Sequence, residues 1–411
     1  MFIQVEPSDD SRDNTSDPKD NTNQKSKFTA SLFQYVRTVF CLGGMFCGEG
    51  NNTRRWKKKV ALLIFVVYLV HIPLYSIAIY DRFTKSENTT GLIGFLMICV
   101  ADIYLSFVGL VKMPKALMDF EQVFNLYKEK YKSNFVTSNR LKRLRIMIAL
   151  TLVNSVVFGP VQMFLYRHNK AILCDVYPSC NLPDNWKYFG FTLNAIFSFM
   201  GHIQWQGHFL VCVIFTTFLL QEFEALAKKF KDLSISSVEN IEKEFEVLVE
   251  HHECLVDVLN GTNDCMCHYS FVIIFLAVPT NCLFLYHAMS KSLTEPELIF
   301  LCCIVTMALT FVGVKVFLEA FVSSKAHDPL RYIWKVRKGI ISERGRQTLD
   351  LFVTRLTGET IGYNVYGLLS ITMPTLLGIV GTLATYIIVV VQFRPTDAPL
   401  CHPTLVRNVT D

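Results

Sequence analysis

The chain has 411 residues, and its composition excludes an ordinary soluble protein of that length: 51% of the residues are hydrophobic, 13% are aromatic and only 18% are charged. The net charge of +5 carries little information by itself, and we expect no nucleic-acid partner. Several runs of about twenty apolar residues are long enough to cross a hydrocarbon core of roughly 30 Å, which predicts an all-α polytopic membrane protein.

The first segment is polar and differs from the rest of the chain. Residues 1–30 are rich in Asp, Asn, Ser, Lys and Thr and contain no apolar stretch of the kind found in a secretory signal. Such a composition cannot bury enough apolar surface to fold alone. We therefore expect residues 1–55 to form a disordered cytoplasmic tail.

Seven apolar segments follow and predict seven transmembrane helices. They lie at about 60–80, 91–111, 146–166, 188–220, 269–289, 297–321 and 366–392. The expected organisation is therefore helices one to four in 56–221, a cytoplasmic helical extension in 222–267, helices five and six in 268–321, a cytoplasmic loop with the first half of helix seven in 322–365, its pore-lining half in 366–393, and an extracellular tail in 394–411.

Basic residues predict the direction of these helices, because loops on the cytoplasmic side are enriched in Lys and Arg. One set of loops and flanks carries 25 Lys or Arg and the other carries 8. This asymmetry predicts a cytoplasmic amino terminus and an extracellular carboxyl terminus. It disfavours a G-protein-coupled receptor, in which the amino terminus is outside. Asp81-Arg82-Phe83 follows the first span instead of the third, and the last span has no Asn-Pro-x-x-Tyr.

Two features fall on the predicted outer side. Asn88 and Asn408 begin glycosylation sequons, whereas the sequons at 14, 51 and 260 lie on the predicted inner side. Cys174 and Cys180 share one outer loop and form either a local disulfide or two free thiols. Most of the thirteen cysteines sit inside apolar runs, where Cys behaves as a small hydrophobic residue.

The segment 222–267 has apolar residues at steps of three and four, the pattern of amphipathic helices. We expect the fourth span to continue into the cytoplasm and a second helix to return to the fifth span. The apolar stripe needs a cover, which favours an oligomerisation surface near the membrane. A solvated helical hairpin without partners is the alternative.

The last segment contains an amphipathic piece at 347–362, a break near Gly358 and Gly362, and a chargeless stretch up to Phe393. This pattern predicts a final helix split into a cytoplasmic half and a spanning half. One stripe of the spanning half recurs at steps of four and three, and we call it the α-stripe: Pro374, Gly378, Gly381, Thr385, Ile388 and Gln392. Its small residues either allow close helix packing or line a pore constricted between Ile388 and Gln392. Since the stripe has no charged ring, such a pore would discriminate weakly among cations.

The motif at the end of this helix is specific. Thr385-Tyr386, five aliphatic residues and Gln392-Phe393 resemble the signature that ends the last span of arthropod gustatory receptors, members of a superfamily of seven-transmembrane ligand-gated channels that includes insect odorant receptors. The tail of eighteen residues after Phe393 is longer than is usual in that family. The resemblance implies a gustatory-type chemoreceptor in the plasma membrane of sensory neurons, a non-selective cation channel assembled as a homo- or hetero-tetramer with other gustatory receptor subunits. The implied pore and gate residues are Thr385, Ile388, Val389, Gln392 and Phe393.

The outer half of the bundle offers aromatic walls with a few hydrogen-bonding groups, which suit a small tastant, a sugar ring included. Ordinary aromatic packing is the alternative. The candidate pocket residues are Asp102, Gln162, Tyr166, Asn194, Phe197, His202, Trp205, Asn281, Phe284 and Tyr286. Asp102 lies within a span, where water contact, pairing and ligand recognition are all open. Lys315 and Glu319 are spaced for a structural salt bridge.

Other function classes find little support. His251, His252, Cys254, Cys265, Cys267 and His268 fit no standard zinc spacing, so no metal site is predicted. No nucleotide loop, nucleophile elbow or paired-carboxylate motif occurs in the predicted cytosolic segments, so we expect neither an enzyme nor a cofactor. A secondary transporter is the alternative from another class, but an inverted repeat with two interrupted helices is expected there. A light-sensing relative of the same fold is a further alternative.

Overall fold

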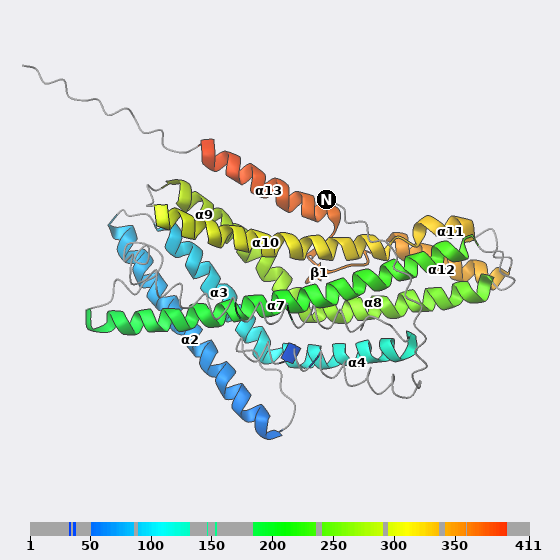
Figure 1. Ribbon diagram of the computed structural model, residues 1–411, viewed down its shortest axis with the longest axis horizontal. Helices are drawn as coiled ribbons and strands as arrows, with labels where there is room; N and C mark the ends of the chain where they lie inside the picture. The colour runs from blue at the N-terminus through cyan, green and yellow to red at the C-terminus, as the bar shows by residue number, and fades with distance from the viewer. Residues whose placement is uncertain are drawn as a thin grey trace, which may run out of the picture.

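The computed structural model describes residues 33, 36–37, 51–85, 89–131, 146, 153, 184–235, 241–290, 295–336, 342–358 and 360–392. This part of the chain is almost entirely helical (Figure 1). Its elements are α2 (Asn51–Thr84), α3 (Thr90–Val111), α4 (Met113–Tyr131), α7 (Asp184–Leu233), α8 (Ile241–Phe271), the π-helix η2 (Val272–Ala277), α9 (Val278–Ser290), α10 (Glu295–Ala326), α11 (Leu330–Val336), α12 (Glu343–Gly358), β1 (Asn364–Val365), β2 (Leu369–Ser370) and α13 (Met373–Gln392).

Five of the described helical stretches are long and apolar enough to cross a membrane: Ala61–Thr84, Thr90–Val111, Ala195–Leu233, Ile241–Met289 and Leu301–Val336. A shorter apolar helix, Met373–Val389, follows. These stretches coincide with six of the seven expected spans and confirm a mostly helical protein with several apolar helices of membrane-spanning length. The expected span at 146–166 lies outside the described residues apart from 146 and 153, so the count of seven and the direction of the chain stay predictions.

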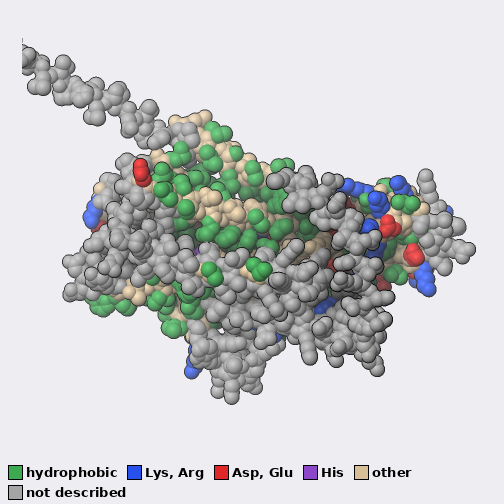
Figure 2. Space-filling view, in the orientation of Figure 1, with side chains coloured by type: hydrophobic (Ala, Val, Ile, Leu, Met, Phe, Trp, Pro, Cys, Tyr) green, Lys and Arg blue, Asp and Glu red, His purple; other side chains and the backbone are tan. Residues whose placement is uncertain are grey.

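Helix α7 is the longest element and gives the molecule its elongated shape (Figure 1). Its 50 residues extend for about 75 Å at 1.5 Å per residue, more than twice the hydrocarbon thickness of roughly 30 Å. Helix α8 packs beside its second half. Charged side chains gather at the end of the molecule formed by α11 and α12, whereas hydrophobic side chains cover the visible face over α9, α10 and α13 (Figure 2).

The charged end has its own aromatic core. The ring of Phe352 on α12 stacks on Phe230 of α7 at 5.7 Å between centroids and meets the edge of Phe245 on α8 at 6.1 Å. The imidazole of His252 lies 5.2 Å from the same ring. All four side chains are buried. This core holds α7, α8 and α12 together, and it covers part of the apolar stripe expected in 222–267 within one chain.

A second aromatic core includes Phe33, a residue of the segment expected to form the amino-terminal tail. Phe33 is completely buried, and its ring lies 5.7 Å from those of Phe120 and Phe124 and 5.8 Å from that of Phe215. Helix α2 also begins at Asn51, before the expected boundary at residue 55. The polar composition of residues 1–30 does not extend to Phe33, because the chain becomes apolar and aromatic from Phe28 onward.

A short β-hairpin separates α12 from α13. Val365 pairs with Leu369 and Asn364 with Ser370, and the turn places Tyr366 and Gly367 at φ of 53° and 71°. Two consecutive positive φ angles are typical of the tight turns that close hairpins. Helix α13 therefore begins at Met373, after the hairpin, whereas the sequence predicts the pore-lining half from residue 366. Hydropathy missed this boundary because the hairpin, like the helix that follows it, is chargeless.

Replacing Phe352 by alanine should destabilise the charged end by about 3 kcal/mol or more, because it removes a buried ring from three neighbours. Thermal unfolding of the purified protein measures this. Thr354→Ala is the matched control, since Thr354 is exposed on the same helix. Equal melting temperatures for the two variants would show that the aromatic core does not hold α12.

The stability of this end should also fall in acid. The pKa of His252 is lowered from an ordinary value of 6.5 to about 4, mainly by burial and also by the charges of Arg355 and His327, while the hydrogen bond to the Ala326 carbonyl opposes this shift. Because the folded state binds the proton less tightly than the unfolded state, this contribution is complete above about pH 6.5 and is lost as the pH falls toward 4. The melting temperature should drop over this range, and less steeply in His252→Gln. An identical pH profile in that variant would contradict the assignment.

Candidate functional site

A cavity of about 150 Å³ lies between α3, α7, η2, α9 and α10. Its walls are mostly apolar and aromatic, and a few polar side chains reach it. The polar residues are Asp102, Ser198, His202, Trp205, Thr280 and Asn281. Small-molecule sites usually combine an apolar enclosure with a few such groups.

Six of the ten expected pocket residues line this cavity: Asp102, Phe197, His202, Trp205, Asn281 and Phe284. Tyr286 does not. It is 42% exposed and neighbours Tyr386 of α13, because it lies on a different face of α9 from Asn281 and Phe284. Asn194 is on α7, but its side chain is outside the described part, and so are Gln162 and Tyr166.

Asp102 forms the polar corner of the cavity. The indole Nε1 of Trp205 donates to its carboxylate Oδ1 at 2.6 Å, and the Gln204 amide donates to its backbone carbonyl at 3.5 Å. The carboxylate faces Gly201, where an added Cβ would lie 2.7 Å from Oδ2. Glycine at this position therefore lets α7 approach the buried acid of α3.

The opposite wall of the cavity was not anticipated. Helix α10 contributes one face with steps of three and four, made of Ile304, Met307, Ala308, Phe311 and Val312. Helix α3 adds Phe95, Met97 and Ile98. These apolar residues are indistinguishable in sequence from lipid-facing ones, although their helical periodicity defines a face that can enclose a pocket.

The wall formed by η2 and α9 contains an irregular turn. Ile273, Leu276 and Ala277 of the π-helix line the cavity together with Thr280 and Asn281. The Asn281 amide donates to the carbonyl of Ala277 at 2.8 Å. Its Oδ1 has no hydrogen-bond partner among the described residues, although the side chain is 2% exposed. Single π-turns inside α-helices are frequent at functional sites.

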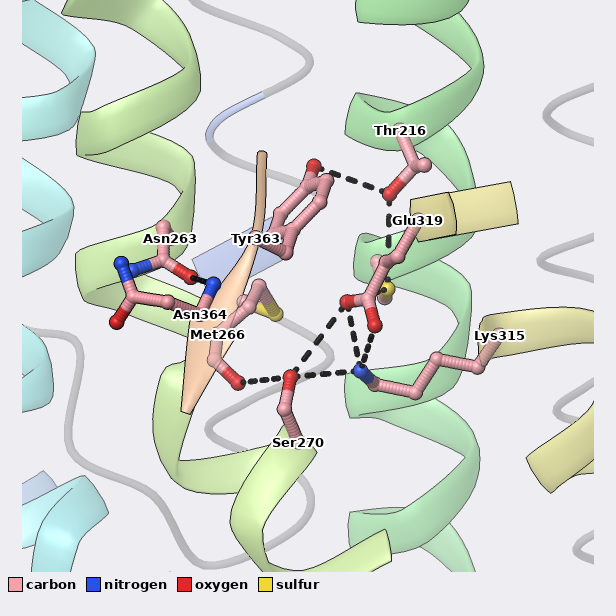
Figure 3. A network of polar contacts seen from close by, with 9 residues as sticks. Thr216, Asn263, Met266, Ser270, Lys315, Glu319, Tyr363 and Asn364 are labelled. Carbon is pink, nitrogen blue, oxygen red and sulfur yellow. Dashed lines mark hydrogen bonds and ion pairs between the residues drawn. The ribbon is translucent and has the colours of Figure 1, made fainter. Parts of the chain in front are cut away.

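A buried ion pair on α10 is the centre of a polar network that joins α7, α8 and α10 (Figure 3). The Nζ of Lys315 lies 2.6 and 2.7 Å from the two carboxylate oxygens of Glu319, and both side chains are completely buried. The same Nζ donates to Ser270 Oγ of α8 at 2.7 Å, and Ser270 donates to the Met266 carbonyl at 3.2 Å. The expected salt bridge is therefore present as the centre of a buried network.

The network reaches the segment that precedes α13. The thiol of Cys212 donates to Glu319 at 3.5 Å and lies 3.6 Å from the Thr216 hydroxyl, which in turn contacts the Tyr363 hydroxyl at 3.1 Å. The backbone N–H of Asn364 donates to Asn263 of α8 at 3.0 Å (Figure 3). The base of α13 is thus attached to α7, α8 and α10.

One residue joins the network to the cavity. The Tyr269 hydroxyl donates to the backbone carbonyl of Trp205 at 3.3 Å, and the Lys315 ammonium lies 5.6 Å from the Tyr269 ring. Tyr269 is completely buried. If a molecule in the cavity displaced Trp205, Tyr269 would move with it and change its contact with the Lys315 ammonium.

A polar cluster also holds the hairpin turn. The Tyr366 hydroxyl contacts Nδ1 of His268 on α8 and the Tyr104 hydroxyl on α3. The Tyr104 hydroxyl lies 3.3 Å from the same Nδ1. Tyr366 has a positive φ, which is costly for a side chain of this size and persists only when its surroundings hold it. These contacts keep the turn against α3 and α8.

Helix α13 packs on one side only. Leu376, Ile379 and Leu383 are half-buried against the main core, whereas every residue of the α-stripe is exposed. An added Cβ at Gly378 or Gly381 would meet nothing within 4 Å. Within a single chain, the stripe therefore has no cover among the described residues.

The remaining expected sites can be placed briefly. Thr385, Ile388, Val389 and Gln392 are exposed on α13, and Phe393 is outside the described residues. Asn88, Asn408, Cys174 and Cys180 are outside them too. Among the residues that the structure describes, no group of three or more His, Cys, Asp or Glu could hold a metal ion.

Comparison with known proteins places this geometry in context. The family model described as 7tm Chemosensory receptor matches residues 32–397. No curated protein sequence matches the chain. The solved olfactory receptor OR5 of the insect Machilis hrabei is similar in its complex with eugenol, with a TM-score of 0.65 and 13% identity over 89% of this chain and 98% of that chain. A second structure of OR5 gives a TM-score of 0.60 and 13% identity over 88% and 98%. At this identity the likeness to OR5 shows the fold alone, and it is the family model that points to a receptor.

Replacing Glu319 by glutamine should destabilise the protein by roughly 3–5 kcal/mol, because the buried Lys315 ammonium loses its counterion. The double variant Lys315→Met with Glu319→Leu should recover most of the loss, since it removes both charges. Thermal unfolding in lipid nanodiscs measures both. If Glu319→Gln is as stable as the wild type, the ion pair does not hold the bundle.

Proposed function

This chain belongs to the 7tm chemosensory receptor family, and from that premise we propose that it is a gustatory-type receptor that works as a ligand-gated, non-selective cation channel. A small tastant binds in the cavity and opens a pore lined by α13. The observation that carries the proposal is the exposed α-stripe on a helix whose opposite face is packed.

The polarity of the exposed face supports a pore. A lipid-facing helix surface is expected to be uniformly apolar, whereas the α-stripe carries two glycines, Thr385 and a terminal Gln392. With no charged side chain on α13, a pore lined by the stripe would pass cations with little selectivity. Thr385, Ile388, Val389, Gln392 and Phe393 are proposed as its pore and gate residues.

The cavity supports the ligand-binding part of the proposal. OR5, whose fold is similar, has been solved in complex with eugenol, a small organic molecule. In this chain Asp102, Phe197, His202, Trp205, Asn281 and Phe284 already line one cavity. Gln162, Tyr166 and Asn194 are proposed to complete the pocket, whereas Tyr286 lies beside Tyr386 of α13.

The positions of α9 and α10 explain how binding could open the pore. Both helices line the cavity, and both contact α13. A ligand that separates or rotates them changes the surface on which Leu376, Ile379 and Leu383 rest. Because the base of α13 is fixed by the Tyr363 contact with Thr216, such a change would move its far end most.

The proposed arrangement of subunits rests on the α-stripe and on exposed residues of α11 and α12. A pore lined by one helix per chain needs several chains around an axis, and we propose a tetramer, either of identical chains or with other gustatory receptor subunits. Leu351 of α12 and Trp334 of α11 are 72% and 61% exposed at the charged end, where contacts between subunits would cover them. The aromatic core of Phe230, Phe245 and Phe352 would give these contacts a rigid base.

The remaining features of the proposal concern topology. The chain crosses the plasma membrane of a sensory neuron seven times, with its amino terminus in the cytoplasm and its carboxyl terminus outside. Helices α12 and α13 are the cytoplasmic and spanning halves of the seventh element, and 222–267 is part of a cytoplasmic anchor. Asn88 and Asn408 are proposed to be glycosylated, and Cys174 and Cys180 to form a disulfide.

Whole-cell recording with ion substitution tests the pore. Replacing Gln392 by glutamate should raise the permeability of Ca²⁺ relative to Na⁺ severalfold, because it places one carboxylate per subunit at the narrow outer end of the pore. Ile379→Val on the packed face of α13 is the control and should leave the permeability ratio unchanged. If the Gln392 variant gives ligand-evoked currents with wild-type selectivity, α13 does not line the conduction path there.

A further inference from the structure

The polar groups of the cavity are unevenly used. Three side chains already donate to the protein: Trp205 Nε1 to Asp102, Thr280 Oγ1 to the Leu276 carbonyl at 2.7 Å, and one N–H of the Asn281 amide to the Ala277 carbonyl. Two acceptors have capacity left. The Asp102 carboxylate accepts one hydrogen bond from the described residues, and Asn281 Oδ1 accepts none. These two acceptors therefore favour an occupant that carries hydrogen-bond donors.

The charge of the cavity points in the same direction. Asp102 is 1% exposed, and no Lys or Arg is among the described residues that line the cavity. The nearby Lys315 is bound to Glu319. The Gln206 amide lies 2.6 Å from Nε2 of His202, and donation to that nitrogen keeps it unprotonated. A buried carboxylate is unfavourable unless a cation pairs with it, and none of these groups supplies one.

The volume and the apolar walls of the cavity limit the size and chemistry of the rest of the ligand. An engineered cavity of about 150 Å³ with apolar walls binds benzene, and this cavity has the same volume. Phe197, Phe284 and Phe311 offer aromatic faces, and Met307 offers an adaptable side chain. One ring fits. A sugar would bring more hydroxyl groups than the walls can bond, and a carboxylic acid would meet the charge of Asp102.

Resting on the proposed function, we propose that the ligand is a small monocyclic amine whose ammonium group pairs with Asp102 and donates to Asn281 Oδ1, while its ring lies among the phenylalanines. The ammonium supplies several donors at one point, as the two acceptors require. A neutral amine that meets a protonated Asp102 forms the same ion pair by taking its proton, so no further reactant is needed.

A size-matched series tests this proposal on the purified full-length protein in nanodiscs. Benzylamine, benzyl alcohol, toluene and benzoate share one ring and differ in charge and donors. Benzylamine should bind roughly ten- to a hundredfold tighter than benzyl alcohol, as expected for a hydrogen-bonded ion pair, and benzoate should not bind. Equilibrium binding by ligand-observed NMR, with thermal stabilisation as a second measurement, gives the order.

Two variants assign the preference to Asp102. Asp102→Asn keeps an acceptor for Trp205 and removes the charge, so it should abolish the preference for benzylamine and leave benzyl alcohol unchanged. Thr310→Val is the matched control, because Thr310 does not line the cavity and its hydroxyl is bonded to the Thr306 backbone carbonyl at 2.7 Å. This control should retain the preference.

Equal binding of benzyl alcohol and benzylamine to the wild type would overturn the proposal, as would an unchanged preference in Asp102→Asn. If Asp102→Asn does not fold, the wild-type series alone decides.

The amine site and the channel can fail separately. Binding of the four ligands in the predicted order without any current supports the amine site and contradicts the channel. Currents evoked by benzyl alcohol or benzoate but not by amines support the channel and contradict the amine site.

Discussion

The interaction on which the described structure depends is the buried pair of Lys315 and Glu319. Both charges are completely removed from solvent, so each needs the other and the polar groups around them. Ser270, Cys212 and, through Thr216, Tyr363 meet that need from α8, α7 and the segment before the hairpin. The pair lies on α10 and its partners come from three other parts of the chain, so satisfying one ion pair fixes how α7, α8, α10 and the base of α13 are placed relative to one another.

In this arrangement α13 is held by polar contacts at its base and by apolar contacts along its length. Its base is anchored by buried polar contacts, and along its length it rests on half-buried apolar side chains that include Leu376, Ile379 and Leu383. The helices beneath it are also the walls of the cavity. The fold therefore places an apolar, easily altered contact between a binding space and the helix with the exposed α-stripe, while the rigid polar contacts stay at one end. Such a division suits a receptor in which binding must move one helix without unfolding the bundle.

Much of this could be predicted from sequence, because the governing signals are local. Apolar runs gave the spans, steps of three and four gave the helical extension, and the i,i+4 spacing gave the pair of Lys315 and Glu319. The rest depends on contacts between distant residues. Phe33 enters a core formed by Phe120, Phe124 and Phe215, and nothing near Phe33 indicates these partners. The hairpin at Tyr366 and the π-turn at Val272–Ala277 lie within apolar stretches whose hydropathy is compatible with regular helix. Tyr286 was assigned to the pocket because aromatic composition does not tell which face of α9 turns inward.

In the proposed receptor the α-stripe faces water while the other face of α13 stays packed. Cysteine substitution along α13, followed by a charged thiol reagent applied from outside during recording, distinguishes the two faces. We expect cysteines at Gly378, Gly381, Thr385, Ile388 and Gln392 to react and change the current, whereas cysteines at Leu376, Ile379 and Leu383 should not react. Reaction of the packed face, or protection of the whole stripe in open channels, would contradict it.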